Sequence, residues 1–203
     1  MEPTAVTLAV LAGGEGRRLG CLKTRLELSG RGILLDLIDR LDWPGPTVLV
    51  GHPDHPNPAG AYRFDQVVFD VEAAQGPMAG VLSAIEVCKT DGICVVGVDM
   101  VHLRRIHLER LLRAAFQRTA TVAMWTTCSA GRRRIQPLPC WISQAAFAGV
   151  REYYRVGGRS LRGLLGLPGS RELAAPLDWP VNVFDGINTL RELAAVKGRI
   201  GSG

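Results

Sequence analysis

Hydrophobic positions in the first two thirds of the chain alternate between short continuous runs and groups with helical spacing. The continuous runs are rich in valine, isoleucine and leucine and predict buried strands, at 6–11, 47–50, 67–69, 93–98 and 120–125. The spaced groups have apolar residues on one side of a helix and predict helices, at 33–41, 78–88 and 103–116. Strands that alternate with helices form βαβ units, so we expect a mostly parallel sheet covered on both faces.

The last third of the chain is less regular because prolines interrupt it repeatedly. Its pattern predicts an antiparallel edge strand, together with helices at 143–154, 160–165 and 189–196. The segment 51–60 is rich in glycine and proline and predicts a surface loop. No segment has the composition of a linker, so we expect one domain over 1–203 with a Rossmann-like, three-layer α/β/α sandwich fold.

The chain of 203 residues carries a net charge of +5 and is 47% hydrophobic, which suits one domain with a substantial core. A basic protein suits anionic ligands such as nucleotides. Because the basic residues are dispersed, apart from Arg132–Arg134, we expect no nucleic-acid-binding arm. The five cysteines include no CxxC pair, which predicts free thiols and a cytoplasmic location. No apolar stretch approaches the ~20 residues that span a membrane, so we expect no membrane segment.

The first predicted strand runs directly into a glycine-rich loop at 13–20. Glycines let backbone N–H groups approach a ligand, and consecutive N–H groups can form a nest for an anion. Arg18 and Lys23 add positive charge that suits a polyphosphate. The loop is not a Walker A motif, because Leu22 precedes the lysine, and not a dinucleotide fingerprint, because Leu19 replaces its last glycine. The simpler alternative is a strand-to-helix turn that binds no ligand.

The string from Leu11 to Lys23 resembles the LAGGxSxRMGxxK motif of the molybdenum cofactor guanylyltransferase family, a group of MobA-like nucleotidyltransferases. Three later segments are similar to further motifs of that family, in the same order. Residues 76–80 (GPMAG) resemble its GPLAG segment, and 95–100 resemble its strand that ends in an aspartate. Residues 187–189 resemble its late NxNT motif. The resemblance extends over nearly the whole chain and implies the fold of the nucleotide-diphospho-sugar transferases.

The resemblance also implies a Mg²⁺-dependent reaction that joins GMP from GTP to the phosphate of molybdopterin and releases pyrophosphate. Both reacting groups are anionic, so charge neutralisation and in-line positioning carry most of the catalysis. By resemblance, Arg18, Lys23 and Asp99 are catalytic candidates, and Asp99 is the candidate Mg²⁺ ligand. The candidate nucleotide-binding residues are Leu11, Ala12, Gly13, Gly14, Gly16, Lys23, Asp70, Gly76, Gly80 and Asn188.

Several of these candidates have simpler explanations. Asp99 could cap the helix that follows it, although it stands slightly too early in the sequence. Asp70 suits a turn at the end of a strand equally well. Arg18 and Lys23 could be a solvated surface pair, since exposure is the default for their residue types. The glycines of 76–80 could serve a turn and helix packing.

The chain departs from the family pattern in two places. The residue after Asp99-Met100 is valine where the family usually has proline, and Gly186 replaces the first asparagine of the late motif. Asp185 could supply a displaced metal or pterin contact, or form a turn. The basic segment 158–162 resembles the family's stretch near the pterin phosphate. These departures affect the identity of the base and the acceptor more than nucleotidyl transfer itself.

Alternative functions follow from these departures. The chain could transfer cytidylate to the molybdenum cofactor, transfer a nucleotide to a phosphorylated metabolite, or bind nucleotide as a non-catalytic adaptor. We expect a monomer or weak oligomer. The segment 51–56 lies where contacts to the base or the acceptor could be made, and the role of its two histidines stays open. His52 and His55 have no identifiable third metal ligand, so no metal site is predicted there. Trp125, Trp141 and Trp179 are predicted to pack in the core or at a hinge rather than to stack on a pterin, although Trp141 could line a pocket.

Overall fold

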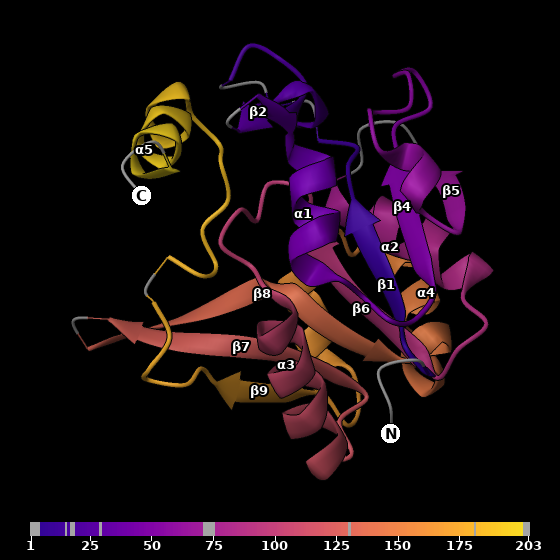
Figure 1. The fold of residues 1–203 in the computed structure, drawn as a ribbon. Coiled ribbons are helices and arrows are strands. Elements are labelled where there is room, and N and C mark those ends of the chain that lie inside the picture. Colours follow the sequence, from indigo (N-terminus) through magenta and orange to yellow (C-terminus); the bar gives the residue numbers. More distant parts are fainter. Residues whose placement is uncertain are drawn as a thin grey trace.

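The computed structural model describes residues 5–14, 16, 19–28, 30–70, 76–129, 131–180 and 182–200. Its centre is a seven-stranded sheet in the order β5-β4-β1-β6-β8-β7-β9 (Figure 1). The strands of this sheet are β1 (Thr7–Leu11), β4 (Thr47–Gly51), β5 (Gln66–Phe69), β6 (Gly92–Gly97), β7 (Val122–Ser129), β8 (Arg132–Ser143) and β9 (Arg171–Ala174). A separate two-stranded sheet consists of β2 (Glu27–Leu28) and β3 (Arg31–Gly32).

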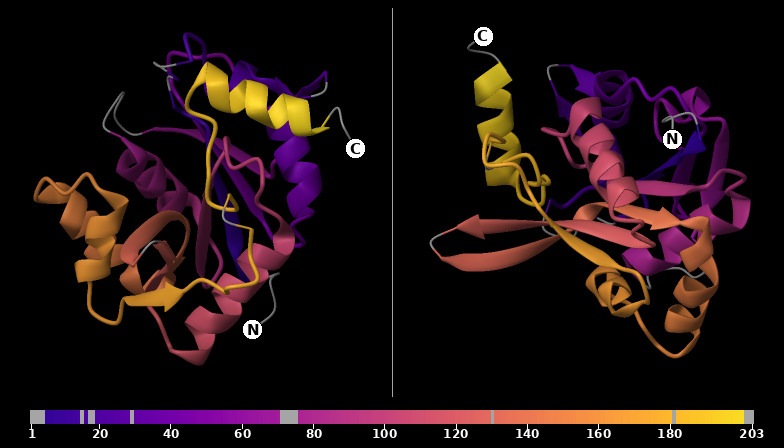
Figure 2. Two further views of the ribbon diagram at one scale, coloured as in Figure 1. Left: turned by 90° about the vertical axis from the view of Figure 1, so that its left-hand side faces the viewer. Right: turned by 90° about the horizontal axis from the view of Figure 1, so that it is seen from below.

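Helices cover both faces of the main sheet, as the alternation of strands and helices predicted (Figure 2). The α-helices are α1 (Ile33–Leu41), α2 (Pro77–Val87), α3 (Arg105–Gln117), α4 (Phe147–Arg155) and α5 (Leu190–Ile200). Short 3₁₀ helices occur at η2 (Lys23–Arg25), η3 (Ala61–Arg63), η4 (Gln144–Ala146) and η5 (Leu161–Gly166). The helix predicted at 143–154 is therefore divided between η4 and α4. Within the described ranges, no helix has the length and apolarity needed to cross a membrane.

The antiparallel strand lies inside the sheet, which corrects the expectation of an antiparallel edge strand. β8 pairs antiparallel with both β6 and β7, whereas β9 forms the edge and runs parallel to β7. The cause is the β7–β8 hairpin, in which Ser129 pairs with Arg132. The returning strand must oppose β7, and β8 is long enough for residues 140–143 to reach β6 as well. The other half of β8 pairs with β7 alone and extends the hairpin outward (Figure 1).

Alternating side chains of the central strands build a core on each face of the sheet. Leu8 and Val10 pack on the face covered by α1 and α3, whereas Ala9 between them packs on the face covered by α2 and α4. Trp125 and Trp141 are 3% and 2% exposed, so the prediction that they pack in the core is confirmed. The strands β1, β4, β5 and β6 are parallel, so their carboxyl ends lie together. Ligands bind beyond the carboxyl ends of the strands in folds of this kind.

Candidate active site

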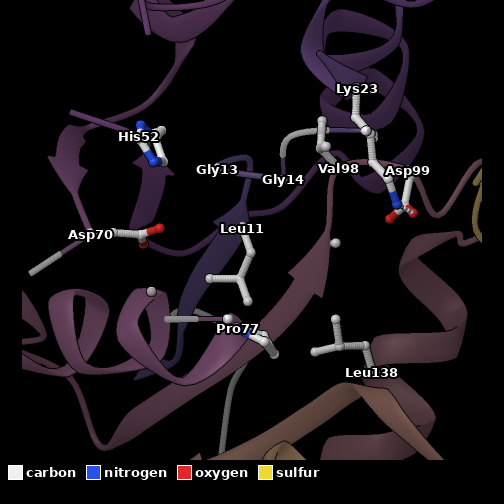
Figure 3. A pocket seen from close by; sticks show the side chains of 14 residues that line it. Leu11, Gly13, Gly14, Lys23, His52, Asp70, Pro77, Val98, Asp99 and Leu138 are labelled. Atoms are coloured by element: carbon white, nitrogen blue, oxygen red, sulfur yellow. Dashed lines mark hydrogen bonds and ion pairs between the residues drawn. The ribbon is translucent and has the colours of Figure 1, made fainter. Parts of the chain in front are cut away.

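A pocket of about 510 Å³ lies at the carboxyl ends of the parallel strands (Figure 3). Its lining residues come from the first half of the chain and from β8, namely Leu11, Gly13, Gly14, Gly16, Lys23, His52, Asp70, Gly76, Pro77, Gly80, Gly97, Val98, Asp99 and Leu138. Nine of these lining residues are among the catalytic and nucleotide-binding candidates that the sequence predicted. Ala12 is not among them, because it is buried and its N–H group donates to the Val50 carbonyl. Arg18 lies outside the described residues.

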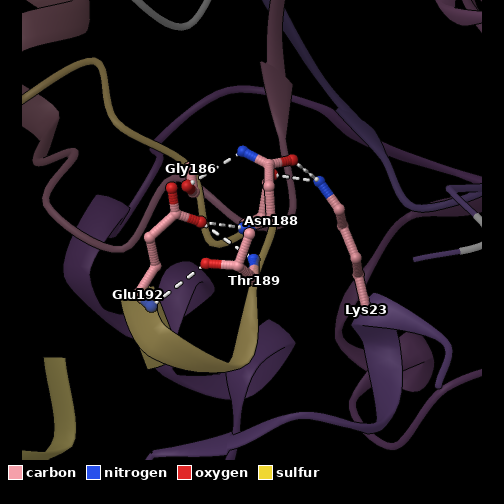
Figure 4. A network of polar contacts seen from close by, with 6 residues as sticks. Lys23, Gly186, Asn188, Thr189 and Glu192 are labelled. Carbon is pink, nitrogen blue, oxygen red and sulfur yellow. Dashed lines mark hydrogen bonds and ion pairs between the residues drawn. The ribbon is translucent and has the colours of Figure 1, made fainter. Parts of the chain in front are cut away.

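Lys23 connects three distant parts of the chain at one end of this pocket. Its Nζ atom donates to Asp99 Oδ2 at 2.5 Å (Figure 3). The same atom donates to Asn188 Oδ1 at 2.7 Å (Figure 4). The side chains of Lys23 and Asp99 are only 17% and 16% exposed, so the solvated-surface explanation for this lysine does not hold. Asp99 does not cap a helix either, since α3 begins at Arg105 and its N-cap is Arg104.

Glycines surround the Asp99 carboxylate and allow backbone to approach it from two sides. A Cβ atom added at Gly97 would lie 2.7 Å from Oδ1, and one added at Gly186 would lie 2.5 Å from Oδ2. The N–H group of Ile187 donates to the Asp99 carbonyl at 3.2 Å. This hydrogen bond holds residues 186–189, which we call the late segment, against Asp99. In this chain, glycine at position 186 lets the backbone lie against the carboxylate, because a Cβ atom there would collide with it.

The late segment is held by a capping box at the start of α5. The N–H groups of Asn188 and Thr189 donate to Glu192 Oε2, and the N–H group of Glu192 donates to Thr189 Oγ1 (Figure 4). Such a reciprocal arrangement satisfies backbone donors that the helix itself cannot pair. The motif at 187–189 thus does two things in this chain: it begins α5 and it presents the Asn188 side chain to Lys23.

Asp70 stands at the other end of the pocket, directly after β5. A Cβ atom at Gly13 would lie 2.8 Å from Asp70 Oδ2, and one at Gly80 would lie 3.0 Å from Oδ1. These two motif glycines therefore make room for the carboxylate. Burial raises the pKa of Asp70 above its ordinary value, and nearby His52 partly offsets this effect.

His52 is a pocket residue whose role the sequence left open. The residue is 7% exposed, and its Nδ1 atom accepts a hydrogen bond from the N–H group of Asp54 at 3.2 Å. A neutral ring that accepts at Nδ1 carries its proton on Nε2. In the described part of the chain, this buried Nε2 atom has no hydrogen-bond partner. The signal that could have identified His52 is its position one residue beyond the end of β4.

Backbone geometry shapes the rest of the pocket. Gly16 has a φ of +57°, and a Cβ atom there would lie 2.2 Å from the Cys21 carbonyl oxygen, so only glycine fits. Gly76 has a φ of +80° and forms the N-cap of α2, with Pro77 as the first helical residue. The α2 N-terminus thus borders the pocket, and helix N-termini favour anions.

Asp99 is the side chain that could hold a divalent cation. No group of three histidine, cysteine, aspartate or glutamate side chains forms a metal site among the described residues. Mg²⁺ is usually held by one or two carboxylates, with phosphate oxygens and water as its remaining ligands. A partly exposed carboxylate at the end of a nucleotide-sized pocket fits that donor set.

Comparisons with known proteins identify the family of this chain. Residues 8–172 match the MobA-like NTP transferase domain. The molybdenum cofactor guanylyltransferases of Cupriavidus metallidurans and Cupriavidus taiwanensis are 29% and 30% identical to this chain. The first match covers 93% of this chain and 92% of the relative. The second match covers 96% of this chain and 97% of the relative.

Solved structures share the fold. Molybdopterin-guanine dinucleotide biosynthesis protein A from Archaeoglobus fulgidus has a TM-score of 0.77 at 20% identity, over 98% of this chain and 100% of that one. The 2-C-methyl-D-erythritol 4-phosphate cytidylyltransferase from Thermus thermophilus has a TM-score of 0.72 at 16% identity, over 95% and 98%. The predicted nucleotide-diphospho-sugar transferase fold is thereby confirmed. The chain belongs to the family of the MobA-like NTP transferase domain and is a nucleotidyltransferase.

Proposed function

We propose that this protein joins GMP from GTP to the phosphate of molybdopterin and releases pyrophosphate. The observation that carries the proposal is the contact of Lys23 with both Asp99 and Asn188 at one end of a glycine-lined pocket. Transfer between two phosphates needs cations that neutralise charge and groups that hold the reactants in line. Lys23 supplies a fixed cation at the point where the glycine loop, β6 and the late segment meet.

The far end of the pocket suits a guanine base. Nε2–H of His52 is a buried donor without a partner among the described residues, and the Asp70 carboxylate is an acceptor nearby. Guanine carries a carbonyl acceptor next to two N–H donors, so its edge complements one donor and one carboxylate. Discrimination is strong where a buried polar group would otherwise remain unpaired. We therefore assign the base to the end of the pocket between His52 and Asp70.

The triphosphate would extend from the glycine loop toward Asp99. When bound, Mg²⁺ would neutralise triphosphate charge and stabilise the leaving pyrophosphate, with Asp99 as its protein ligand. Lys23 would then exchange its contact with Asp99 for one with phosphate oxygens, while Asn188 keeps the ammonium group in place. Arg18 would add a second cation from the glycine loop.

The cellular setting is part of the same proposal. We assign the protein to the cytoplasm, where it would act as a monomer or weak oligomer without nucleic acid or membrane. All five cysteines are free thiols, in keeping with a reducing compartment.

A direct transfer assay tests the proposal. The protein would be incubated with Mg²⁺, molybdopterin and each of GTP, CTP and ATP labelled in the α-phosphate. We expect label from GTP to appear in the pterin product, and magnesium-free reactions to give none. Transfer from CTP in preference to GTP would refute the base assignment, and no transfer from any nucleotide would refute the catalytic assignment.

A further inference from the structure

A second cavity lies between the β7–β8 hairpin and the segment that follows β9. Its volume is about 370 Å³, and Arg132, Arg134, Trp179 and Asp185 are among its lining residues. It adjoins a third cavity of about 750 Å³, which shares Arg134 and Asp185 with it. The third cavity also contains Gly186 and Asn188, the residues beside Asp99 and Lys23. The two cavities together, which we name the acceptor groove, lead from the hairpin to the reaction centre.

The charged side chains of the acceptor groove fall into two groups, because Glu192 is engaged in the capping box of α5 whereas three others have no such contact. Successive residues of a strand point to opposite faces, so Arg132 and Arg134 share a face and Arg133 takes the other. Arg133 forms an ion pair with Glu172. Within the described ranges, neither Arg132, Arg134 nor Asp185 makes a side-chain hydrogen bond or ion pair. Two guanidinium groups and one carboxylate are therefore available to a ligand in the same groove.

Aromatic side chains form the floor beside these charges. Trp179 is half-buried, and its ring lies edge-on against His107 at 4.7 Å and Trp125 at 5.2 Å between ring centroids. Phe184 lies 5.9 Å from Trp179 and lines both cavities. Trp179 therefore packs on the core, as the sequence predicted, but it also lines the groove, where the sequence expected no pterin to stack. Rings that are fixed in this way suit a flat heteroaromatic ligand, because binding costs them little conformational freedom.

We propose that the acceptor groove binds the pterin of the acceptor substrate, an inference that rests on the proposed function. The pterin ring lies against Trp179 and Phe184, and the Asp185 carboxylate accepts hydrogen bonds from the amino group and adjacent ring N–H. Arg132 and Arg134 complement the pterin carbonyl and the anionic arm, since guanidinium groups match carbonyl and phosphate oxygens. The arm runs past Gly186 toward Lys23, where its phosphate meets the nucleotide.

Two exposed substitutions and a matched control test this proposal. Arg134→Gln and Asp185→Asn remove one charge each, and Arg133→Gln removes a charge from the neighbouring position on the opposite face of β8. Pterin and lumazine serve as fluorescent probes, because lumazine differs from pterin in having a carbonyl in place of the amino group. Equilibrium titration gives their dissociation constants, steady-state kinetics give KM for molybdopterin and for GTP, and calorimetry gives GTP affinity.

We expect wild-type protein to bind pterin more tightly than lumazine. Arg134→Gln and Asp185→Asn should weaken pterin binding and raise KM for molybdopterin by about ten- to hundredfold, because each loses a hydrogen bond to a charged group. Asp185→Asn should also reduce the preference for pterin over lumazine. GTP affinity should stay within about twofold in all three variants, and Arg133→Gln should match wild type throughout.

The results separate failure of this inference from failure of the proposed function. If wild type catalyses guanylyl transfer but does not bind pterin, or if both variants keep wild-type constants for pterin and molybdopterin, the groove assignment is wrong and the function stands. An equal loss in Arg133→Gln would also overturn the assignment, because it would indicate a general effect of charge. If transfer is absent while pterin binding responds as expected, the groove stands and the proposed reaction is wrong.

Discussion

The nucleotide pocket and the acceptor groove meet at Asn188 but differ in the groups that line them. In the pocket, glycines let the backbone approach a ligand, and Lys23 and Asp99 form an ion pair with each other. In the groove, the side chains of Arg134 and Asp185 make no hydrogen bond or ion pair with the residues that the structure describes. The difference indicates that the pocket is preorganised by backbone, whereas the groove acquires its polar contacts from a ligand. Substitutions in the pocket should therefore impair the reaction itself, and those in the groove should impair acceptor binding alone.

Removal of the Asp99 carboxylate is the most severe test of this contrast. We expect Asp99→Ala to lower kcat by roughly hundred- to thousandfold, because it removes the proposed Mg²⁺ ligand and releases Lys23. Steady-state rates of GMP transfer at saturating GTP and Mg²⁺ provide the measurement. The thermal midpoint should fall by only a few degrees, since the carboxylate lies at the edge of the core.

Asp99→Asn is the matched control for shape, because it keeps the size of the side chain and removes its charge. Both variants should lose similar activity if the charge is what matters. Activity close to wild type in Asp99→Asn would contradict the assigned metal role.

The next largest effect is expected at Lys23, and it can be compared with a smaller effect at Asn188, which orients the Lys23 ammonium group. Lys23→Met should lower kcat/KM for GTP by roughly hundredfold, because the side chain keeps its length and loses its charge. Asn188→Ala should lower it by about tenfold, since it removes one hydrogen bond to Lys23 and leaves the ion pair with Asp99 intact. Parallel kinetic measurements on the two variants provide the comparison.

Combining the two substitutions shows whether they act through the same contact. If Asn188 works by orienting Lys23, the double variant should be no worse than Lys23→Met alone. A further tenfold loss in the double variant would mean that Asn188 contacts a substrate directly.

A smaller effect is expected where a glycine makes room for Asp70. Gly13→Ala places a Cβ atom 2.8 Å from Asp70 Oδ2 and forces that carboxylate to move. KM for GTP should rise by about tenfold, because the proposed base contact is displaced. KM for molybdopterin should be unchanged, which would sharpen the distinction between pocket and groove.

Gly32→Ala provides the control for this substitution. Among the described residues, no atom outside the two chain neighbours of Gly32 lies within 4 Å of the added Cβ, and the φ of −60° is open to alanine. We expect wild-type kinetics for Gly32→Ala. Equal KM values for GTP in Gly13→Ala and wild type would remove Asp70 from the base site.

Hydrophobic pattern predicted the helices and strands well where each element buries its own face. The helix at 33–41 has its predicted bounds, because its four buried leucine and isoleucine positions follow helical spacing. The location of β8 could not be predicted in this way, since a period of two residues identifies a strand but not its neighbours. Only the hairpin with β7 and the length of β8 place it between two parallel strands.

The candidate site was predictable in part for a similar reason. Motif resemblance identified Lys23, Asp99 and Asn188 separately, but 165 positions separate the two ends of the Lys23–Asn188 contact, so no local pattern predicts it. His52 was left open because a proline-rich loop ordinarily lies at the surface, and only the fold buries it. The groove was missed because its arginines and its aromatic floor belong to distant segments with no shared motif.

The smallest expected effect concerns His107, which supports the groove through Trp179. Burial lowers the pKa of His107 below its ordinary value of 6.5, and the positive charges of Arg104 and Arg110 lower it further. The folded protein therefore binds this proton less readily than the unfolded chain does. The stability that the neutral ring contributes is complete above pH 6.5 and is lost as the pH falls through the lowered pKa.

His107→Gln tests this link, because glutamine can keep the hydrogen bond that Nδ1 accepts from the Arg104 N–H group and cannot titrate. On acidification below pH 6.5, the wild-type thermal midpoint should fall a few degrees further than that of the variant. KM for molybdopterin should also rise in wild type more than in His107→Gln, since the protonated ring would disturb its contact with Trp179. If KM for molybdopterin depends on pH in the same way in both proteins, protonation of His107 does not affect acceptor binding, and the proposed link between His107 and the groove is wrong.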